Sequence, residues 1–499
     1  MAFDAREYSG EQAVLIIGTG FSGLGMGIRL KQAGIDSFTI LERADGVGGT
    51  WRDNHYPGCA CDVQSHLYSF SFEQNPEWTR MFAPQPEIRS YLEHCADKYG
   101  LKAHIRFNAE VVEARYDEAA ALWRVRTRDG RAFSARALVS GMGGLSNPAF
   151  PKIPGLETFI GPTFHSAQWN HEVDLRGKRV AVIGSGASAI QFVPQIVPQV
   201  AHLDYYQRTP PWILPKPDRD VSAFERRLFR LLPFTQRLFR NAIYWLMESR
   251  VVGFKRNSRI MPFAQRVARA HIRRQVADPA LRRKVTPDYA IGCKRILISN
   301  DYYPAISKSH VDVITDAIAE VRPHGIVTAD GSEREVDAII FGTGFKAQDP
   351  IPRGAVFGRG GIDIVDSWKD GPEAYLGTMT SGFPNFFMLM GPNTGLGHNS
   401  MVYMIESQIE FVMNALRTLR DRHAKAIDVR PEVQKSYNAG IQQRLAGAVW
   451  SSGCKSWYLN DRGKNTTLWP GFTFVFRRLT RRFEPKDYVL EPERSEVRS

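Results

Sequence analysis

The stretch Val14-Leu15-Ile16-Ile17-Gly18-Thr19-Gly20-Phe21-Ser22-Gly23 decides the fold of this chain. Its first four residues are an apolar run of the kind that forms a buried parallel strand. The pattern G-x-G-x-x-G follows at once and opens a helix that we expect to end near Gly34. A second apolar run, Phe38–Leu41, leads to Glu42. This order of strand, glycine turn, helix and strand, closed by an acid, predicts a Rossmann-type dinucleotide site.

The same arrangement recurs further along the chain. Val180–Ile183 is a second apolar strand candidate, and it is followed by the turn Gly184-Ser185-Gly186-Ala187-Ser188. Counting 24 residues from the first glycine of each turn leads to Glu42 (42 − 18 = 24) and to Arg208 (208 − 184 = 24). A carboxylate binds free ribose hydroxyls, whereas an arginine suits a 2′-phosphate. We therefore predict an FAD site first and an NADPH site second; an Arg208 merely solvated at a strand end is the alternative.

Two longer motifs accompany these units. Residues 48–62 read GGTWRDNHYPGCACD and match [AG]-G-x-W-x4-[YF]-P-G-x3-D, and residues 159–169 read FIGPTFHSAQW, with the spacing F-x-G-x3-H-x3-W. With these motifs the chain resembles the Baeyer–Villiger monooxygenases over nearly its whole length. The wider flavin-containing monooxygenases are similar too, but they generally lack the tryptophan at 169. One departure is Asn170, where the family usually has proline or aspartate.

The resemblance implies an α/β fold with two Rossmann-like dinucleotide-binding domains and a helical insertion in the second. The FAD-binding domain would comprise residues 1–145 and 346–499, the latter including the C-terminal tail. The NADPH-binding domain would span 146–345, with its insertion at about 217–285. Glycine-rich crossings at 140–144 and 342–345 would act as hinges between the domains. We expect the charged tail beyond Glu484 to be loose.

The resemblance also implies the roles of individual residues. Arg295 would be the catalytic cation beside the flavin, and Asp62 its partner, because an unpaired carboxylate among apolar and aromatic residues would be costly. Lys294 would assist Arg208 at the 2′-phosphate, and Trp457 would belong to a loop that folds over the nicotinamide nucleotide. Cofactor contacts would come from Gly18, Gly20, Phe21, Ser22, Gly23, Glu42, Thr50, Trp51, Asp62, Tyr68, Val111, Met401, Ser185, Gly186, Ser188, Gln191, Arg208, Thr209, Lys294, Arg295 and Trp457.

The predicted reaction is the insertion of one oxygen atom of O2 next to a ketone carbonyl, which gives an ester or lactone through a flavin peroxide. Arginine stays charged at any working pH, so Arg295 would keep that peroxide anionic. An enzyme that oxygenates nitrogen or sulfur is the alternative, as is a non-catalytic nucleotide-binding module. Trp51, Asp62 and the pair Lys294-Arg295, all present together, argue against the module. No motif indicates which ketone is oxidised.

The composition and charge of the chain limit which classes of binding partner suit it. The chain has 499 residues, 43% hydrophobic and 23% charged, with a formal net charge of +13. This charge suits polyphosphate cofactors, an anionic membrane or nucleic acid, but no nucleic-acid motif accompanies it. The arginine-dense stretch 219–283 predicts basic helical faces, which are most often merely solvated. Contact with a membrane surface is the sharper alternative.

Cysteine content and the chain start suggest a cellular compartment. Five cysteines in a long chain predict reduced thiols. Cys59 and Cys61 lack the spacing and partners of a zinc site, so we expect no metal. The first residues lack a signal-peptide core, and no apolar run is long enough to span a bilayer. We therefore predict a cytoplasmic protein.

Overall fold

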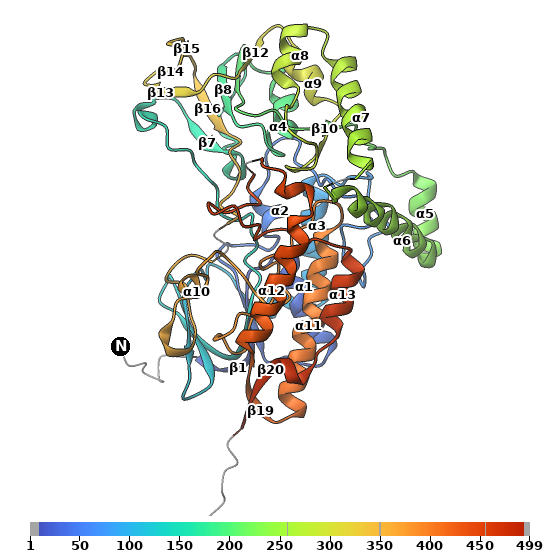
Figure 1. Cartoon of the computed structure of the whole chain (residues 1–499), viewed down its shortest axis with the longest axis vertical. Coiled ribbons are helices and arrows are strands. Elements are labelled where there is room, and N and C mark those ends of the chain that lie inside the picture. Colours follow the sequence, from blue (N-terminus) through green and yellow to red (C-terminus); the bar gives the residue numbers. More distant parts are fainter. Residues whose placement is uncertain (1–8, 257, 349–350, 455, 494–499) are drawn as a thin grey trace, which may run out of the picture.

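The chain is organised around two main sheets in different halves of the molecule (Figure 1). The structure is a computed structural model that describes residues 9–256, 258–348, 351–454 and 456–493. Each sheet contains one of the two units of strand, glycine turn and helix. The predicted α/β fold with two Rossmann-like units is therefore confirmed.

The first sheet has the strand order β17-β4-β5-β6-β1-β2-β3, and β18 pairs with β6 outside this path. β1 runs parallel to β2 and β6, whereas β4, β5 and β6 pair antiparallel. Its strands are Ser9–Ile17 (β1), Phe38–Leu41 (β2), Ile105–Arg106 (β3), Val111–Asp117 (β4), Leu122–Thr127 (β5), Ala132–Ser140 (β6), Val356–Phe357 (β17) and Phe386–Met388 (β18). Because β17 and β18 come late in the sequence, the chain returns to this sheet after building the second.

Helices cover the first sheet because Val14–Ile17 of β1 and the neighbouring strand β2 are buried. α1, Phe21–Gln32, follows β1 directly after the glycine turn and packs against α11, Met401–Asp421. The other helices of this half are Thr50–Asp53 (α2), Gln85–Lys98 (α3), Ile364–Ser367 (α10), Pro431–Ala446 (α12) and Thr473–Arg481 (α13). Short 3-10 turns lie at Leu101–His104, Leu156–Thr158, Ser166–Gln168, Arg250–Phe254, Arg359–Gly361, Val449–Ser451 and Pro485–Asp487.

The second sheet is parallel throughout, in the order β12-β9-β8-β16-β7. Its strands are Thr163–His165 (β7), Arg179–Ile183 (β8), His202–Tyr206 (β9), Val311–Ile314 (β12) and Ala338–Phe341 (β16), and α4, Ala189–Ile196, follows its glycine turn. Smaller elements are the β-ladder of Ile318–Arg322 (β13), Gly325–Thr328 (β14) and Glu333–Glu335 (β15), the pair Ile213–Leu214 (β10) and Leu297–Ile298 (β11), and helix Tyr302–Ile306 (α9).

Four helices lie between β10 and β11, within the stretch where the insertion was expected. They are Ala223–Leu231 (α5), Pro233–Ser249 (α6), Ile260–Gln275 (α7) and Pro279–Val285 (α8). α5 begins with a capping box in which Ser222 and Glu225 satisfy each other's backbone donors. α5 and α6 lie at the outer side of the molecule, away from both sheets (Figure 1). None of the helices in the described ranges has the length and apolarity that crossing a membrane requires.

The segment that follows the first glycine-rich crossing lies beside the second crossing. Ala149 donates its N–H to the Gly344 carbonyl at 2.9 Å, and a backbone bridge joins Pro148 and Phe345. His165 is fully buried beneath them, with its ring centroid 5.8 Å from that of Phe345. The histidine of the F-x-G-x3-H-x3-W motif thus supports the segments through which the halves connect.

The expectation of a loose tail beyond Glu484 is wrong for the described part. Residues Tyr488–Pro492 form β20, which pairs antiparallel with β19, Ala424–Val429. The Tyr488 ring is buried and stacks on Phe483 with centroids 4.3 Å apart. The buried ring and the pairing with β19 together anchor the strand. Residues 494–499 lie outside the described residues.

His66 joins the first half of the molecule to α6. Gln236 of α6 donates from Nε2 to Nδ1 of His66 at 3.1 Å, and the rings of Phe229 and Phe239 lie 5.1 and 5.3 Å away. Burial among these groups lowers the pKa of His66 to about 4, because the charged imidazolium would lose its hydration. The folded protein therefore holds this histidine neutral.

Acid should weaken the fold through His66. In the unfolded chain the imidazole takes up a proton below about pH 6.5, whereas the folded protein resists this until about pH 4. The stabilisation is thus complete above pH 6.5 and is lost as the pH falls, by about 2 kcal/mol at pH 5. We expect the Tm of the wild type to fall more steeply between pH 7 and pH 5 than that of His66→Asn, whose amide oxygen replaces Nδ1 as acceptor. Parallel curves would contradict this.

Candidate functional site

The first glycine turn is shaped for close approach of a ligand. A Cβ atom on Gly23 would lie 1.8 Å from the Gly18 carbonyl oxygen, so only glycine lets α1 start this close to β1. A Cβ on Gly20 would instead meet nothing nearer than the Gly49 Cα at 3.8 Å. Space therefore remains beside Gly20, at the start of α1. This arrangement fits the pyrophosphate of a dinucleotide.

Glu42 closes β2 beside this turn and is buried. One carboxylate oxygen accepts from the N–H and the hydroxyl of Thr19 at 2.9 and 2.6 Å. The other accepts from the N–H of Ala44 at 3.0 Å and from Arg52 at 3.2 Å. The carboxylate is fixed at the strand end where the sequence predicts a ribose contact, and ribose hydroxyls would share its oxygens with these donors.

An aromatic cluster lies at the start of α1. Trp51 donates from Nε1 to the Tyr68 hydroxyl at 3.1 Å, and the Phe21 ring lies 5.1 Å from that of Tyr68. Burial raises the pKa of Tyr68 well above its usual range, so its hydroxyl stays protonated. Three predicted cofactor contacts thus come together as one apolar wall. Thr50 begins α2 directly before Trp51.

Asp62 and Arg295 form the ion pair expected from the sequence. Arg295 Nη2 lies 3.3 Å from Asp62 Oδ2, and 41% of the Arg295 side chain is accessible to solvent. Burial by surrounding protein lowers the pKa of Arg295, but Asp62 and Tyr458 outweigh it and raise that pKa above its usual value. The Arg295 guanidinium is therefore partly accessible to solvent beside Asp62. It stays charged there and keeps donors free for a bound molecule.

Gln191 fixes the loop that carries Asp62. Its Oε1 accepts from the Tyr56 hydroxyl at 2.9 Å, and its Nε2 donates to the Ala60 carbonyl at 3.0 Å and to Asp62 Oδ1 at 3.4 Å. Gly58 has φ +77°, and a Cβ there would lie 2.7 Å from the Gln191 carbonyl oxygen. Since Gln191 belongs to α4 of the second half, the Asp62 loop is held between the two halves. These bonds position the loop, and the cofactor contact of Gln191 stays a prediction.

Two cations come together beside the second glycine turn. Burial lowers the pKa of Lys294, and the nearby positive charge of Arg208 lowers it further. Across the ranges that the structure describes, neither side chain lies within 4.0 Å of a carboxylate. Ser185 of the turn donates to the carbonyl of Thr209 at 3.0 Å, which ties the turn to the end of β9. Two positive charges that lie close together without a neighbouring carboxylate are suited to binding a phosphate group.

The expectation of five free thiols is wrong for two of them. Cys293 and Cys454 form a disulfide, while Cys59, Cys61 and Cys95 are free and buried. The two paired cysteines are 161 positions apart, so their spacing in the sequence gave no indication of the contact. The bridge connects the residue before Lys294 with the segment that leads to Trp457.

Tyr458 is a neighbour of Arg295 that the sequence did not single out. It is buried, and burial raises its pKa to about 12 although Arg295 lowers it. The adjacent Trp457 is 44% exposed, and its carbonyl accepts from Gln348 Nε2 at 2.5 Å. Trp457 therefore precedes a neighbour of Arg295 in the chain and has a partly exposed side chain that a ligand could contact. The sequence placed Tyr458 only in the loop expected to fold over the nicotinamide nucleotide, and gave no sign of its contact with Arg295.

The remaining predicted contacts are more scattered. Ser188 is the N-cap of α4, one turn before Gln191. Val111 begins β4 and packs against the core of the first sheet, whereas Met401 begins α11 and packs against the cluster around Trp450. Among the described residues, His202, Asp204 and Asp312 could also hold a metal ion. Arg334 instead pairs with both of these carboxylates, at 2.9 and 2.8 Å.

Comparison with known proteins relates this geometry to a family. Residues 15–225 match the family described as pyridine nucleotide-disulphide oxidoreductase. A Baeyer–Villiger monooxygenase of Pseudomonas aeruginosa is 61% identical, covering 96% of this chain and 91% of that protein. Cyclohexanone monooxygenase from Rhodococcus sp. Phi1 bound to NADP+ is 29% identical, with a TM-score of 0.87 over 97% of this chain and 99% of that one.

A further solved structure shows the same arrangement with both nucleotides. The OTEMO complex with FAD and NADP is 27% identical, with a TM-score of 0.86 over 96% of this chain and 99% of that one. The similarity to these proteins therefore extends over both sheets and the helices between them. Together with the identity to the Pseudomonas enzyme, it establishes that the chain belongs to the Baeyer–Villiger monooxygenases.

Proposed function

We propose that Arg295, held in place by Asp62, is the residue through which this enzyme inserts oxygen next to a ketone carbonyl. The enzyme depends on FAD and NADPH and converts a ketone and O2 to an ester or lactone. When bound, FAD takes electrons from NADPH and activates O2. The observation that carries the proposal is the Arg295–Asp62 pair, 3.3 Å apart, with 41% of the Arg295 side chain accessible to solvent. Arg295 would stabilise negative charge on the oxygen being transferred, and Asp62 would orient it.

The residues present fit both cofactors. The open side of the Gly20 turn, the fixed carboxylate of Glu42 and the ring of Trp51 would hold FAD. Arg208 and Lys294 would bind the 2′-phosphate of NADPH. We accordingly assign residues 1–145 and 346–499 to an FAD-binding domain and 146–345 to an NADPH-binding domain. The crossings would let the two domains rotate against each other.

Loss of Arg208 should affect the use of NADPH and that of NADH to different extents. We expect Arg208→Ala to raise the KM for NADPH far more than that for NADH, because only NADPH carries the 2′-phosphate. The loss of a charged contact at a partly exposed site is worth about 1.5–3 kcal/mol, or roughly tenfold to a hundredfold in KM. Steady-state NADPH oxidation measures it, with Arg176→Ala as the control, because Arg176 pairs only with Asp174 on the surface of the same half. Equal wild-type efficiency with both nucleotides would refute the assignment.

We also propose that the arginine-rich insertion contacts an anionic membrane surface. Between residues 226 and 277 the chain has thirteen lysines and arginines and a single acid, Glu248. Glu248 is fully buried, so it does not offset the basic surface. Contact with anionic lipid would neutralise these charges.

The cytoplasmic location of the protein stays a prediction from the sequence.

A further inference from the structure

An unpartnered apolar surface lies on the outer face of α6. Phe234, Leu238 and Trp245 recur at spacings of four and seven residues, so they share one face of the helix. Together with two leucines at the end of α5 and Leu246 of α6, they form a surface that we call the apolar stripe. Each of its six residues is 45–65% exposed: Leu231, Leu232, Phe234, Leu238, Trp245 and Leu246. Proteins seldom leave such a row of large apolar side chains in water without an interaction partner.

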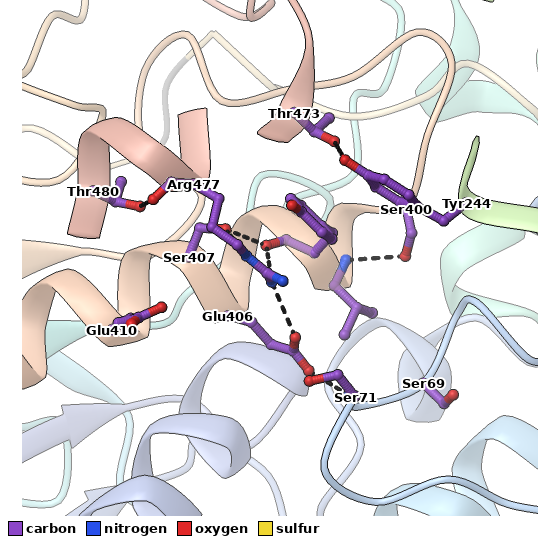
Figure 2. Close-up of polar contacts among 12 residues, drawn as sticks. Ser69, Ser71, Tyr244, Ser400, Glu406, Ser407, Glu410, Thr473, Arg477 and Thr480 are labelled. Carbon is purple, nitrogen blue, oxygen red and sulfur yellow. Dashed lines mark hydrogen bonds and ion pairs between the residues drawn. The ribbon is translucent and has the colours of Figure 1, made fainter. Parts of the chain in front are cut away.

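The opposite face of α6 is fixed to the body of the protein. Arg240 donates to the carbonyls of His66 and Leu67 at 2.7 and 3.1 Å. Figure 2 shows Tyr244 directed at Thr473 of α13, and their hydroxyls are 3.0 Å apart. α6 is therefore held rigidly with the apolar stripe outward, and the stripe cannot be buried by a rotation of the helix.

The same junction continues into α11. Arg477 of α13 pairs with Glu406 at 3.2 Å, and Glu406 accepts from the backbone N–H of Ser71 at 2.5 Å (Figure 2). On α13, Phe474 is 41% exposed, and its ring centroid lies 6.0 Å from that of Trp245. Phe474 extends the apolar stripe onto the next helix.

Positive charge adjoins the apolar stripe. A hollow of about 620 Å³ is lined by Leu231 of the stripe together with Glu77, Ala223, Arg226, Arg227 and Arg230. Arg230 pairs with Glu77 at 2.6 Å. In the described part of the chain, Arg226 and Arg227 have no carboxylate within 4.0 Å. The hollow thus offers two arginines to an anionic group beside a row of apolar side chains.

This combination selects lipid over a second copy of the chain. A symmetric dimer through the apolar stripe would face the same basic surface against itself, and the like charges would repel. A helix with large apolar residues on one face and arginines at its border has the composition of helices that lie in a membrane interface. We infer that the apolar stripe inserts into an anionic bilayer surface while Arg226 and Arg227 bind headgroup phosphates. This rests on the proposed membrane contact of the insertion and deepens it by adding apolar insertion to the attraction between charges.

Vesicle sedimentation tests the inference with the FAD-loaded enzyme. Vesicles of phosphatidylglycerol and phosphatidylcholine should carry the enzyme down, whereas phosphatidylcholine alone should carry much less. Binding should weaken as salt rises but persist in part, because salt screens the arginines and not the apolar contacts. The assay needs neither ketone nor NADPH, so its failure is separate from failure of the proposed reaction.

Two double variants distinguish the apolar contribution to membrane binding from the contribution of the arginines. Leu238→Ser with Trp245→Ser should weaken partition by about tenfold or more, because two large apolar side chains no longer leave water. Arg226→Gln with Arg227→Gln should weaken binding at low salt and flatten its salt dependence. Ile362→Ser is the matched control, since Ile362 is 54% exposed outside the insertion and should leave binding unchanged. Retained flavin absorbance and turnover in vesicle-free buffer verify that each variant is folded.

Three results would overturn the inference. The wild type could fail to sediment with anionic vesicles at low salt. The Leu238→Ser/Trp245→Ser enzyme could sediment as well as the wild type. Sedimentation velocity could show a wild-type dimer that this double variant dissociates, which would mean that a second copy covers the apolar stripe.

Discussion

Replacing Arg295 by alanine is expected to lower ester formation by about two to three orders of magnitude. The loss of one preorganised donor that stabilises developing negative charge costs about 2.7–4 kcal/mol, and Arg295 is a partly accessible cation paired with Asp62. FAD should still bind, because its proposed contacts at the Gly20 turn, Glu42 and Trp51 are untouched. NADPH oxidation should continue and yield hydrogen peroxide in place of ester. Ester and hydrogen peroxide measured together in one assay report this.

Related variants identify what Arg295 contributes. Arg295→Lys keeps the charge but loses the planar fork of donors, so it should fall between wild type and Arg295→Ala. Asp62→Ala should give a milder loss than Arg295→Ala, because the guanidinium stays charged but is badly placed. Arg176→Ala removes an exposed arginine and should change nothing. If Arg295→Ala makes ester at close to the wild-type rate, the role of Arg295 is wrong.

Gly23→Ala is expected to abolish FAD retention. The added Cβ would lie 1.8 Å from the Gly18 carbonyl oxygen, and both atoms belong to segments that cannot rotate away. The start of α1 would therefore move away from β1, and the backbone donors that face the pyrophosphate would move with it. We expect affinity for FAD to drop at least about a hundredfold, since a displacement of this size removes several hydrogen bonds to a charged group at once. Absorbance of the purified protein near the flavin band, with and without added FAD, measures the loss.

Gly440→Ala is the matched control for this substitution. Gly440 lies within α12, and a Cβ there would have no heavy atom within 4 Å. This variant should bind FAD like the wild type, and an alanine in a helix should if anything stabilise it slightly. A yellow, active Gly23→Ala enzyme would show that the turn tolerates a side chain and would refute the account of the flavin site.

The parts of the fold that the sequence predicted are those with local signals. The Gly18 and Gly184 turns follow apolar strands and open helices, so strand, turn and helix support each other within some twenty residues. The Asp62–Arg295 pair was reached across 233 positions, through a buried charge that needs a partner and a family that supplies one. Both inferences rest on residues whose chemistry leaves few alternatives.

What the sequence did not predict depends on contacts between distant segments. The Cys293–Cys454 disulfide required two loops to meet, and Tyr458 approaches Arg295 through the same meeting. Gln191 was predicted as a cofactor contact, but its bonds to the Asp62 loop depend on how α4 packs against that loop. β20 forms because Tyr488 finds an aromatic partner, which its charged neighbours in the sequence obscured. Such features depend on how distant segments pack together, which local sequence motifs do not indicate.

The most direct test of the central claim is isotope transfer from molecular oxygen. Purified enzyme with FAD, NADPH and ¹⁸O2 is given linear, cyclic and aromatic ketones, and the products are analysed by mass spectrometry. The account predicts that at least one ketone gives an ester or lactone with one ¹⁸O atom, and that the product disappears in Arg295→Ala. An enzyme that oxygenates amines or sulfides with NADPH but yields no labelled ester from any of these ketones would contradict it.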